Sequence, residues 1–144
     1  MVASLNDVYG FISTQVTTDA QLTTMQHNRI WTHQAPENVP APYFIMAKQT
    51  GNFNFALNST RTHDSHYVMI KSVTQSSASG ADGGALGRDA MNRLRELIVF
   101  QRPTLTAGYT MVIKESHDFE YREAESGNVI IYHVGVVFEI MLGH

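Results

Sequence analysis

The sequence predicts an α+β domain with two helices packed on a mainly antiparallel sheet of four to six strands. Apolar residues recur at helical spacing in two stretches, one at the N-terminus and one that ends before Pro103. Elsewhere, apolar and polar residues alternate with the two-residue period of half-buried strands. The resulting order, α-β-β-β-α-β-β, is typical of helices packed on one sheet. The 144 residues suit a single domain spanning 1–144.

The first helix is predicted from an apolar stripe with helical spacing: Leu5, Val8, Tyr9, Ile12 and Val16. Ser4, followed three residues later by Asp7, has the spacing of a capping box, so the helix is expected to begin near Ser4. Thr18 or Asp19 then caps a short second turn that carries Leu22.

A proline-rich connection separates the first two predicted strands. A short strand near Arg29–His33 precedes it, and a strand at about Tyr43–Gln49 follows it. We name residues 34–42 the proline arch, after its three prolines: Pro36, Pro40 and Pro42. Proline fixes φ and removes a backbone donor, so the arch is expected to be stiff and to be neither helix nor central strand.

The chain after this second strand is predicted to prolong a hairpin. Phe53, Phe55 and Leu57 alternate with polar residues, and Asn58-Ser59 supplies turn chemistry. A further strand is expected over His66–Thr74.

A Gly/Ser-rich segment, Gln75–Gly84, is predicted to be a flexible loop because it supplies no side chains for a core. A second helix over Ala85–Val99 follows, with Asp82 or Ser79 helping to cap it. Pro103 prevents this helix from continuing far. Its apolar face is formed by five residues: Leu86, Ala90, Leu94, Leu97 and Ile98.

The last third of the chain is predicted to be strand, with Tyr109, Met111 and Ile113 on one face of the first run. The run over 129–142 exceeds the usual ~5–6 residues of a strand, so a bend or bulge is expected at Gly135. Its second face is partly apolar, which suggests that both sides of the sheet are covered. The more apolar face is formed by Ile130, Tyr132, Val134, Val136, Phe138, Ile140 and Leu142.

The composition argues against several functional classes. The net charge is -3 with no basic block, so sequence-specific or broad nucleic-acid binding is not predicted. Absence of cysteine excludes disulfides, thiol nucleophiles and thiolate metal sites. No apolar run approaches the ~20 residues that span a bilayer, and the N-terminus does not resemble a signal peptide. Charged residues are 16% of the chain against a typical ~25%, which suits a protein that assembles.

A histidine cluster is the candidate for chemistry: His63, Asp64 and His66, which His117 and His133 could approach from neighbouring strands. Metal ligands must converge on one point, whereas in a strand His63 and His66 point to opposite faces. Solvated loop histidines are therefore the favoured interpretation. No serine lies in a strand–G-x-S-x-G–helix context, and the glycines of 80–87 lack the ending of a P-loop. The sequence predicts no catalytic residue, no metal site and no cofactor.

Two further groups of side chains have two interpretations each. Aromatic residues flank the proline arch: Trp31, Tyr43 and Phe44. They form either a peptide-binding groove or, as we favour, core contacts at a sheet edge. Charged residues follow the second helix: Arg88, Arg93 and Arg95, with Glu96. They form a solvated face or ion pairs between subunits.

Residues 19–46 carry a distinctive series of features. A helix end, Asp19-x-x-Leu22, precedes Arg29-Ile30 and an aromatic residue at Trp31. Ala35-Pro36, a spacer and Pro42-Tyr43 then open a hydrophobic strand. This series resembles the tail-terminator, or tail-completion, family of long-tailed bacteriophages. The later order of strand, Gly/Ser-rich loop, helix GRDAMNRLRELI and closing strand YHVGVVFEIML is similar to that family's layout. Two segments depart from it by their length: Gly51–Ser65 and Ser116–Asn128.

The resemblance implies a non-enzymatic structural protein located in the virion at the head–tail junction and assembled in the bacterial host cytoplasm. Family members form a homohexameric ring that caps the tail tube, ends tail polymerisation and joins the tail to the head connector. The implied partners are other copies of the chain, the tail tube protein and a connector or stopper protein, with DNA passing through the ring. We expect the C-terminal strands and Gly51–Ser65 to contribute contacts. The interface candidates are Trp31, Tyr43, Phe53, Phe55, Arg61, Arg88, Arg95 and Glu139.

Three alternatives remain open at the level of sequence. The first is another ring protein of the head–tail neck. The second is a small metal-dependent hydrolase that uses His63, Asp64, His66 and His117. The third is a ligand-binding α+β module with a pocket under the proline arch.

Overall fold

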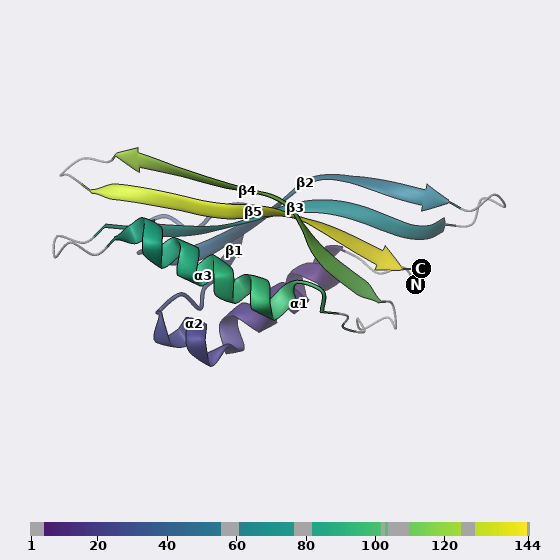
Figure 1. Ribbon diagram of the computed structural model, residues 1–144, viewed down its shortest axis with the longest axis horizontal. Coiled ribbons are helices and arrows are strands. Elements are labelled where there is room, and N and C mark those ends of the chain that lie inside the picture. Colours follow the sequence, from purple (N-terminus) through teal and green to yellow (C-terminus); the bar gives the residue numbers. More distant parts are fainter. Residues whose placement is uncertain are drawn as a thin grey trace.

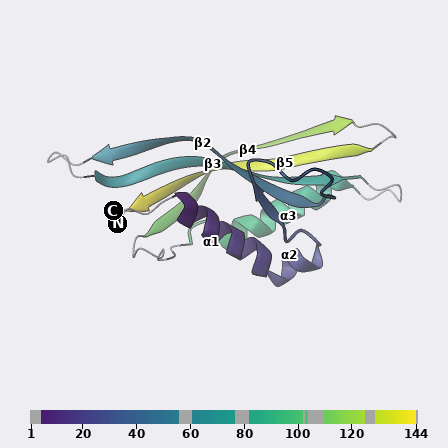
Figure 2. The same ribbon diagram turned by 180° about the vertical axis from the view of Figure 1, so that it is seen from behind.

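The computed structural model describes residues 5–55, 61–76, 82–101, 103, 110–124 and 129–143, with only the backbone described at 52–55 and 61–62. Its helices lie on one face of a single twisted sheet (Figures 1 and 2). The α+β prediction is confirmed, and five strands fall within the predicted range. The elements are α1 (Leu5–Thr18), α2 (Ala20–Thr24), β1 (Ile30–Thr32), β2 (Tyr43–Phe55), β3 (Arg61–Gln75), α3 (Gly83–Ile98), β4 (Met111–Ala124) and β5 (Ile130–Gly143).

The sheet has the strand order β1-β2-β3-β5-β4, so β3 is its middle strand and β1 and β4 lie at its edges. The pairs β2–β3, β3–β5 and β4–β5 are antiparallel, as predicted for most of the sheet. The pair β1–β2 is parallel, with Ile30 opposite Phe44. The proline arch therefore acts as a short crossover that returns the chain to the start of β1. The Arg29 guanidinium donates hydrogen bonds to the carbonyls of Pro40 (2.6 Å) and Pro42 (3.1 Å). These bonds hold the end of the proline arch against the residue that precedes β1.

The hydrophobic core lies between the sheet and the helices. Val8, Ile12 and Val16 of α1 and Leu94 and Ile98 of α3 are fully buried, as their helical spacing predicts. Each large apolar side chain of this kind contributes roughly 1.5–3 kcal/mol on burial. The strands contribute the alternate residues predicted for β5: Val134, Val136, Phe138, Ile140 and Leu142.

The coverage of the sheet differs from the prediction. In both views the three helices lie on the same side, and no described helix lies on the other (Figures 1 and 2). The partly apolar second face of β5 therefore has no helix over it. No helix among the described residues is long and apolar enough to cross a membrane.

The predicted bulge at Gly135 is wrong. The β3–β5 register runs without interruption through Lys71 opposite Gly135. The irregularities lie in the flanking strands, between Lys48 and Thr50 of β2 and between Glu115 and His117 of β4. Glycine is needed at 135 for a different reason, because a Cβ there would overlap the ring of Phe119 on β4.

The helix caps agree with the sequence where the structure describes them. Asp19 caps α2 by accepting a hydrogen bond from the Leu22 amide at 2.9 Å. Asp82 caps α3 by accepting from the amides of Gly84 (2.9 Å) and Ala85 (3.3 Å). The helix begins at Gly83, two residues before the predicted start, and both of its first glycines are buried. Ser4, Leu57, Ser79, Tyr109 and the Asn58-Ser59 turn lie outside the described residues.

Candidate assembly surfaces

The two edges of the sheet are the first candidate surface. On one side, β1 pairs with β2 only from Phe44 to Met46, and the rest of β2 has no outer partner strand among the described residues. On the other side, the amide of Phe100 donates to the Ile113 carbonyl of β4 at 2.8 Å. Beyond Ile113, β4 has no outer partner strand in the described part of the chain. Unpaired strand edges readily accept further strands.

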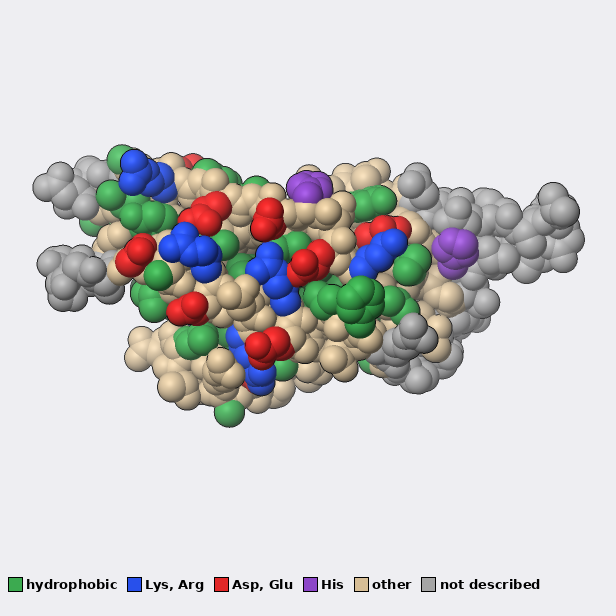
Figure 3. Space-filling model, in the orientation of Figure 1, with side chains coloured by type: hydrophobic (Ala, Val, Ile, Leu, Met, Phe, Trp, Pro, Cys, Tyr) green, Lys and Arg blue, Asp and Glu red, His purple; other side chains and the backbone are tan. Residues whose placement is uncertain are grey.

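Charged side chains join β4 to α3 within the chain. Arg88 approaches Glu120 at 2.6 Å, and Arg95 approaches Glu115 at 2.5 Å and Asp118 at 3.8 Å. Basic and acidic side chains accordingly alternate over α3 and the adjacent strand (Figure 3). The acidic residues lie on the helix side of β4, because their partners in β5 belong to the core face. The predicted interface arginines, Arg88 and Arg95, thus have partners in their own chain.

The side of the sheet opposite the helices, which we name the helix-free face, is half apolar. Its residues follow from the strand register and include Ile45, Tyr67, Met69, Val73, Val112, Phe119, Tyr121, His133, Val137 and Met141. Val73, His133 and Val137 are buried, whereas most of the others are half-buried. An unpartnered apolar face of this kind is typical of a protein that assembles.

A hollow of about 240 Å³ lies at the middle of the helix-free face, between the two bulges. The bulges flank the same row of the sheet, in which Lys48 pairs with Val68 and Glu115 pairs with Phe138. A bulge bends and twists its strand, so the two bulges bend β2 and β4 at the same row of the sheet. The hollow is lined by Gln49, Thr50, Tyr67, Ser116, His117 and Val137.

Aromatic rings stack across β4 and β5 on the helix-free face. Tyr121 lies flat on His133, with ring centroids 4.4 Å apart, and Phe119 lies 6.1 Å from Tyr121. Lys71 donates to the Tyr121 hydroxyl at 3.1 Å. Burial lowers the pKa of His133, and the positive charge of Lys71 lowers it further, while Glu123 at 3.3 Å acts in the opposite direction.

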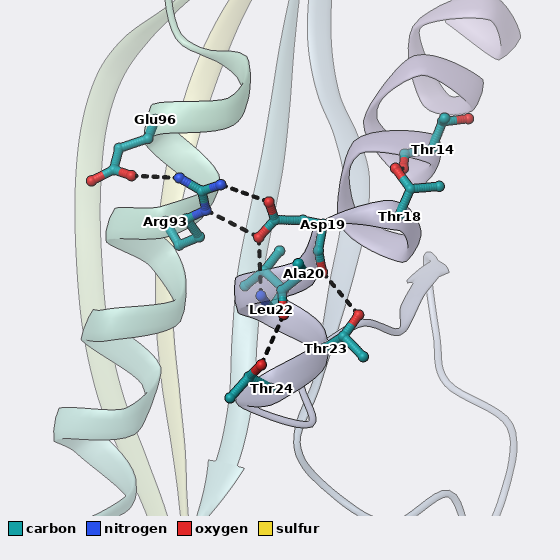
Figure 4. Close-up of polar contacts among 9 residues, drawn as sticks. All are labelled: Thr14, Thr18, Asp19, Ala20, Leu22, Thr23, Thr24, Arg93 and Glu96. Atoms are coloured by element: carbon teal, nitrogen blue, oxygen red, sulfur yellow. Dashed lines mark hydrogen bonds and ion pairs between the residues drawn. The ribbon is translucent and has the colours of Figure 1, made fainter.

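A partly buried ion pair connects α2 to α3 in the helical layer. Arg93 of α3 binds both carboxylate oxygens of Asp19, at 2.6 and 3.0 Å, while Asp19 also caps α2 (Figure 4). Arg93 reaches Glu96 with its remaining nitrogen at 2.8 Å. The hydrogen bond from Arg93 holds the pKa of Asp19 below its usual value, and the pKa of Arg93 is raised in turn. Arg93 therefore connects α3 to α2 and does not belong to a solvated face of the helix.

The remaining interface candidates fall in different parts of the sheet. Trp31 and Tyr43 flank the arch on the helix-free face, since they pair with Ile45 and Val73. Glu139 lies on the same face and binds Lys114 at 3.2 Å. The other three belong to the far part of the β2–β3 pair, which extends beyond the helices (Figures 1 and 2): Phe53, Phe55 and Arg61. The eight candidates do not form one patch.

The interpretation of His63, Asp64 and His66 as part of a solvated loop is wrong, because all three lie in strand β3 and two of them are buried. The strand does point His63 and His66 to opposite faces, as its parity predicts. His63 pairs with Gly143, whereas Asp64 and His66 share the opposite, core side of β3, where both are buried. His117 is exposed on β4. No group of three or more potential metal ligands converges among the described residues.

A small hollow lies beside the proline arch, where the sequence left open a ligand-binding pocket. Its volume is about 60 Å³, against ~300–1,000 Å³ for a typical small-molecule site. We name it the Leu86 hollow; it is lined by Met25, His27, Pro42, Leu86 and Asp89. His27 is buried in its floor, packs against Phe44 with the two rings tilted by 56°, and shares a hydrogen bond of 3.0 Å with Ser72. Burial lowers the pKa of His27 to about 4, so the ring is neutral at pH 7.

Two exposed apolar residues were not identified from the sequence. The helical pattern places Leu86 on the buried stripe of α3, whereas the side chain is 49% exposed. Phe100 follows the end of α3, is 70% exposed and has a positive φ of 57°. Such a conformation costs a non-glycine residue on the order of 1–3 kcal/mol. A positive φ has no periodic signature, so the sequence contains no clear signal for this position.

Comparisons with known proteins bear on the fold. No family model and no curated protein matches the sequence. A chain from a solved structure described as the virion of a native gene transfer agent particle has a similar fold, with a TM-score of 0.66. The similarity covers 92% of each chain at 16% sequence identity. At this level of identity the likeness concerns the fold alone.

Proposed function

We propose that this chain is a structural virion protein that forms a ring on the end of a phage-like tail tube. The ring ends tube polymerisation and joins the tail to the head connector. The observation that carries the proposal is the similarity of fold, over 92% of both chains, to a chain of a virion particle. The resemblance of residues 19–46 to tail terminators supports the more specific role.

The surfaces of the molecule support assembly of several copies. A ring is built from heterologous contacts, in which one side of each subunit meets a different side of the next. The two edges of the sheet carry different residues. One edge is formed by β1 and the proline arch, and the other by the charged strand β4. The half-apolar helix-free face supplies additional surface for subunits or the tube. We place the interface candidates named above, with the far part of the β2–β3 pair, among these contacts.

The first test measures solution mass by light scattering, with and without tail tube protein. We expect a species of about six times 16.1 kDa, alone or on the tube. Added to polymerising tube protein, the chain should shorten the tubes seen by electron microscopy as its concentration rises. Monomers under both conditions, together with unchanged tube lengths, would contradict the proposal.

A second measurement separates a tail terminator from another neck ring protein. The chain, tagged at one end, is mixed with tube protein and with portal-side proteins in separate experiments. Selective co-purification with the tube protein supports termination. Selective binding to the portal side would reassign the ring to the connector.

A further inference from the structure

His133 is a titratable residue that is buried on the helix-free face, although no described helix packs there. It lies on β5 and is only 8% exposed. The ring of Tyr121 on β4 covers it, parallel to the imidazole within 11° at a centroid distance of 4.4 Å. Tyr121 itself is 44% exposed. The burial of His133 therefore depends on a surface side chain that can move without disturbing the core.

The two nitrogens of the His133 ring have different surroundings. Nε2 lies 3.3 Å from a carboxylate oxygen of Glu123, which accepts a hydrogen bond from the Nε2–H of the neutral ring. Nδ1 is buried and has no hydrogen-bond partner in the described part of the chain. Nδ1 is consequently the nitrogen that takes up a second proton. While Tyr121 covers the ring, that proton would be a buried donor without an acceptor, which is costly.

Lys71 both holds Tyr121 in place and adds a positive charge beside His133. It lies on β3 opposite Gly135 of β5, and its ammonium group donates a hydrogen bond of 3.1 Å to the Tyr121 hydroxyl. Lys71 reaches across β5 because Gly135 has no side chain, and a Cβ there would lie 2.9 Å from Lys71 Cβ. The ammonium group that positions Tyr121 therefore also opposes a positive charge on the imidazole.

The charges around His133 favour its neutral form while the stack is intact. The strands that flank β5 contribute Lys71 from β3, and Tyr121 and Glu123 from β4. Burial lowers the pKa of His133 most, Lys71 lowers it further, and Glu123 acts in the opposite direction. The Glu123 side chain is 60% exposed, so solvent screens its effect. Moving Tyr121 away would hydrate Nδ1 and remove most of the cost of protonation.

We infer that protonation of His133 and the stacked position of Tyr121 exclude each other, so that the two residues form a pH-sensitive switch on the helix-free face. With a neutral imidazole, Tyr121 lies flat on the sheet and is held there by Lys71. With an imidazolium, the buried Nδ1–H and the repulsion from Lys71 displace Tyr121, water reaches Nδ1, and the phenol ring projects from the face. Every group involved belongs to one chain, so the switch is independent of the proposed ring.

A pH titration of the natural chain by NMR, from about pH 8 to about pH 5, tests the switch directly. The His133 ring signals should titrate with a midpoint below the ordinary 6.5. The Tyr121 ring signals should shift with the same midpoint, because loss of the stack and uptake of the proton are one event. Tyr121 signals that stay constant while His133 titrates would overturn the switch.

Variants of the three neighbours test the cause of the shift. Tyr121→Ala removes the cover, and Lys71→Met removes the charge while keeping an unbranched side chain, so each should raise the His133 midpoint. Glu123→Gln removes the carboxylate and should lower it.

Tyr67→Ala is the matched control for Tyr121→Ala. Tyr67 lies on the same face but pairs with Glu139, six residues along β5 from His133, so its loss should leave the midpoint unchanged. A His133 midpoint that is the same in Tyr121→Ala as in the natural chain would contradict the inference, because the stack would then not control protonation.

Discussion

The two faces of the sheet share the same strands but have different surroundings. The face toward the helices is closed: Phe44, Ile70, Phe138 and Ile140 are fully buried there. The helix-free face carries comparable apolar residues, yet Met69, Tyr67 and Met141 are only half-buried. The difference shows that alternation in a strand reports which residues share a face, but not whether that face is completed by the chain itself or by a partner.

The largest effect should come from a core residue on the covered face. Phe138→Ala removes a fully buried ring from the centre of β5 and should lower the free energy of unfolding by about 3–5 kcal/mol. Tyr121→Ala, on the helix-free face, should cost less than ~1 kcal/mol. Urea denaturation of both variants measures the contrast. Similar losses would mean that the two faces are equally packed in the isolated chain.

Acid should weaken the covered face through His27. The folded pKa of about 4 lies below the ordinary 6.5, so the unfolded chain binds the proton more tightly. Stability is complete above the unfolded pKa and falls as the pH drops from about 6.5 toward 4, by about 2–3 kcal/mol. His27→Gln should flatten this part of the profile of stability against pH. An unchanged slope in His27→Gln would exclude His27 as the source.

The lowered pKa of His133 acts in the same direction on the helix-free face. Any acid-induced loss that persists in His27→Gln should therefore be reduced by a second change, His133→Gln. Urea denaturation of the single and double variants at several pH values separates the contribution of His27 to the loss of stability from that of His133.

Removing the Asp19–Arg93 ion pair should have an intermediate effect on the free energy of unfolding. Asp19→Ala deletes both the cap of α2 and the partner of Arg93, and should cost about 2 kcal/mol. Asp19→Asn retains a capping oxygen and should cost less. Thermal denaturation compares the two variants. Equal losses would mean that the charge of Asp19 carries the whole effect.

The smallest effect should arise where two strands touch on the helix-free face. A Cβ at Gly135 would overlap the ring of Phe119 and lie 2.9 Å from Lys71 Cβ, so Gly135→Ala should cost about 1–2 kcal/mol. Phe119→Ala in the same chain should restore part of the loss. Gly10→Ala is the matched control, because nothing lies within 4 Å of the added carbon. A Gly135→Ala variant as stable as that control would contradict the packing described.

Several parts of the fold could be predicted because their signals are local. The stripes of α1 and α3, the Asp19 and Asp82 caps and the two faces of β5 each depend on residues close together in the chain. The parallel pairing of β1 with β2 could not, since a proline-rich segment specifies stiffness but not the direction of its exit. The bulges at Lys48–Thr50 and Glu115–His117 depend on how distant strands pair, and their flanking residues carry no distinctive pattern.

The interface candidates show the same division. Arg88 and Arg95 were identified as charged positions on a helix, but their contacts with Glu120 and Glu115 required β4 to lie beside α3. Phe100 and Leu86 carry no sequence signal as surface residues, because one depends on a backbone angle and the other on what its helix leaves uncovered.

The sequence by itself determined the α+β class, the caps at Asp19 and Asp82 and the separation of β5 into two faces, because periodicity and capping act over a few residues. Only the tertiary structure decided that all described helices lie on one face of the sheet, and that Leu86 and Phe100 are exposed. The reason is physical: burial and edge exposure depend on which distant segments meet, and no local pattern records that.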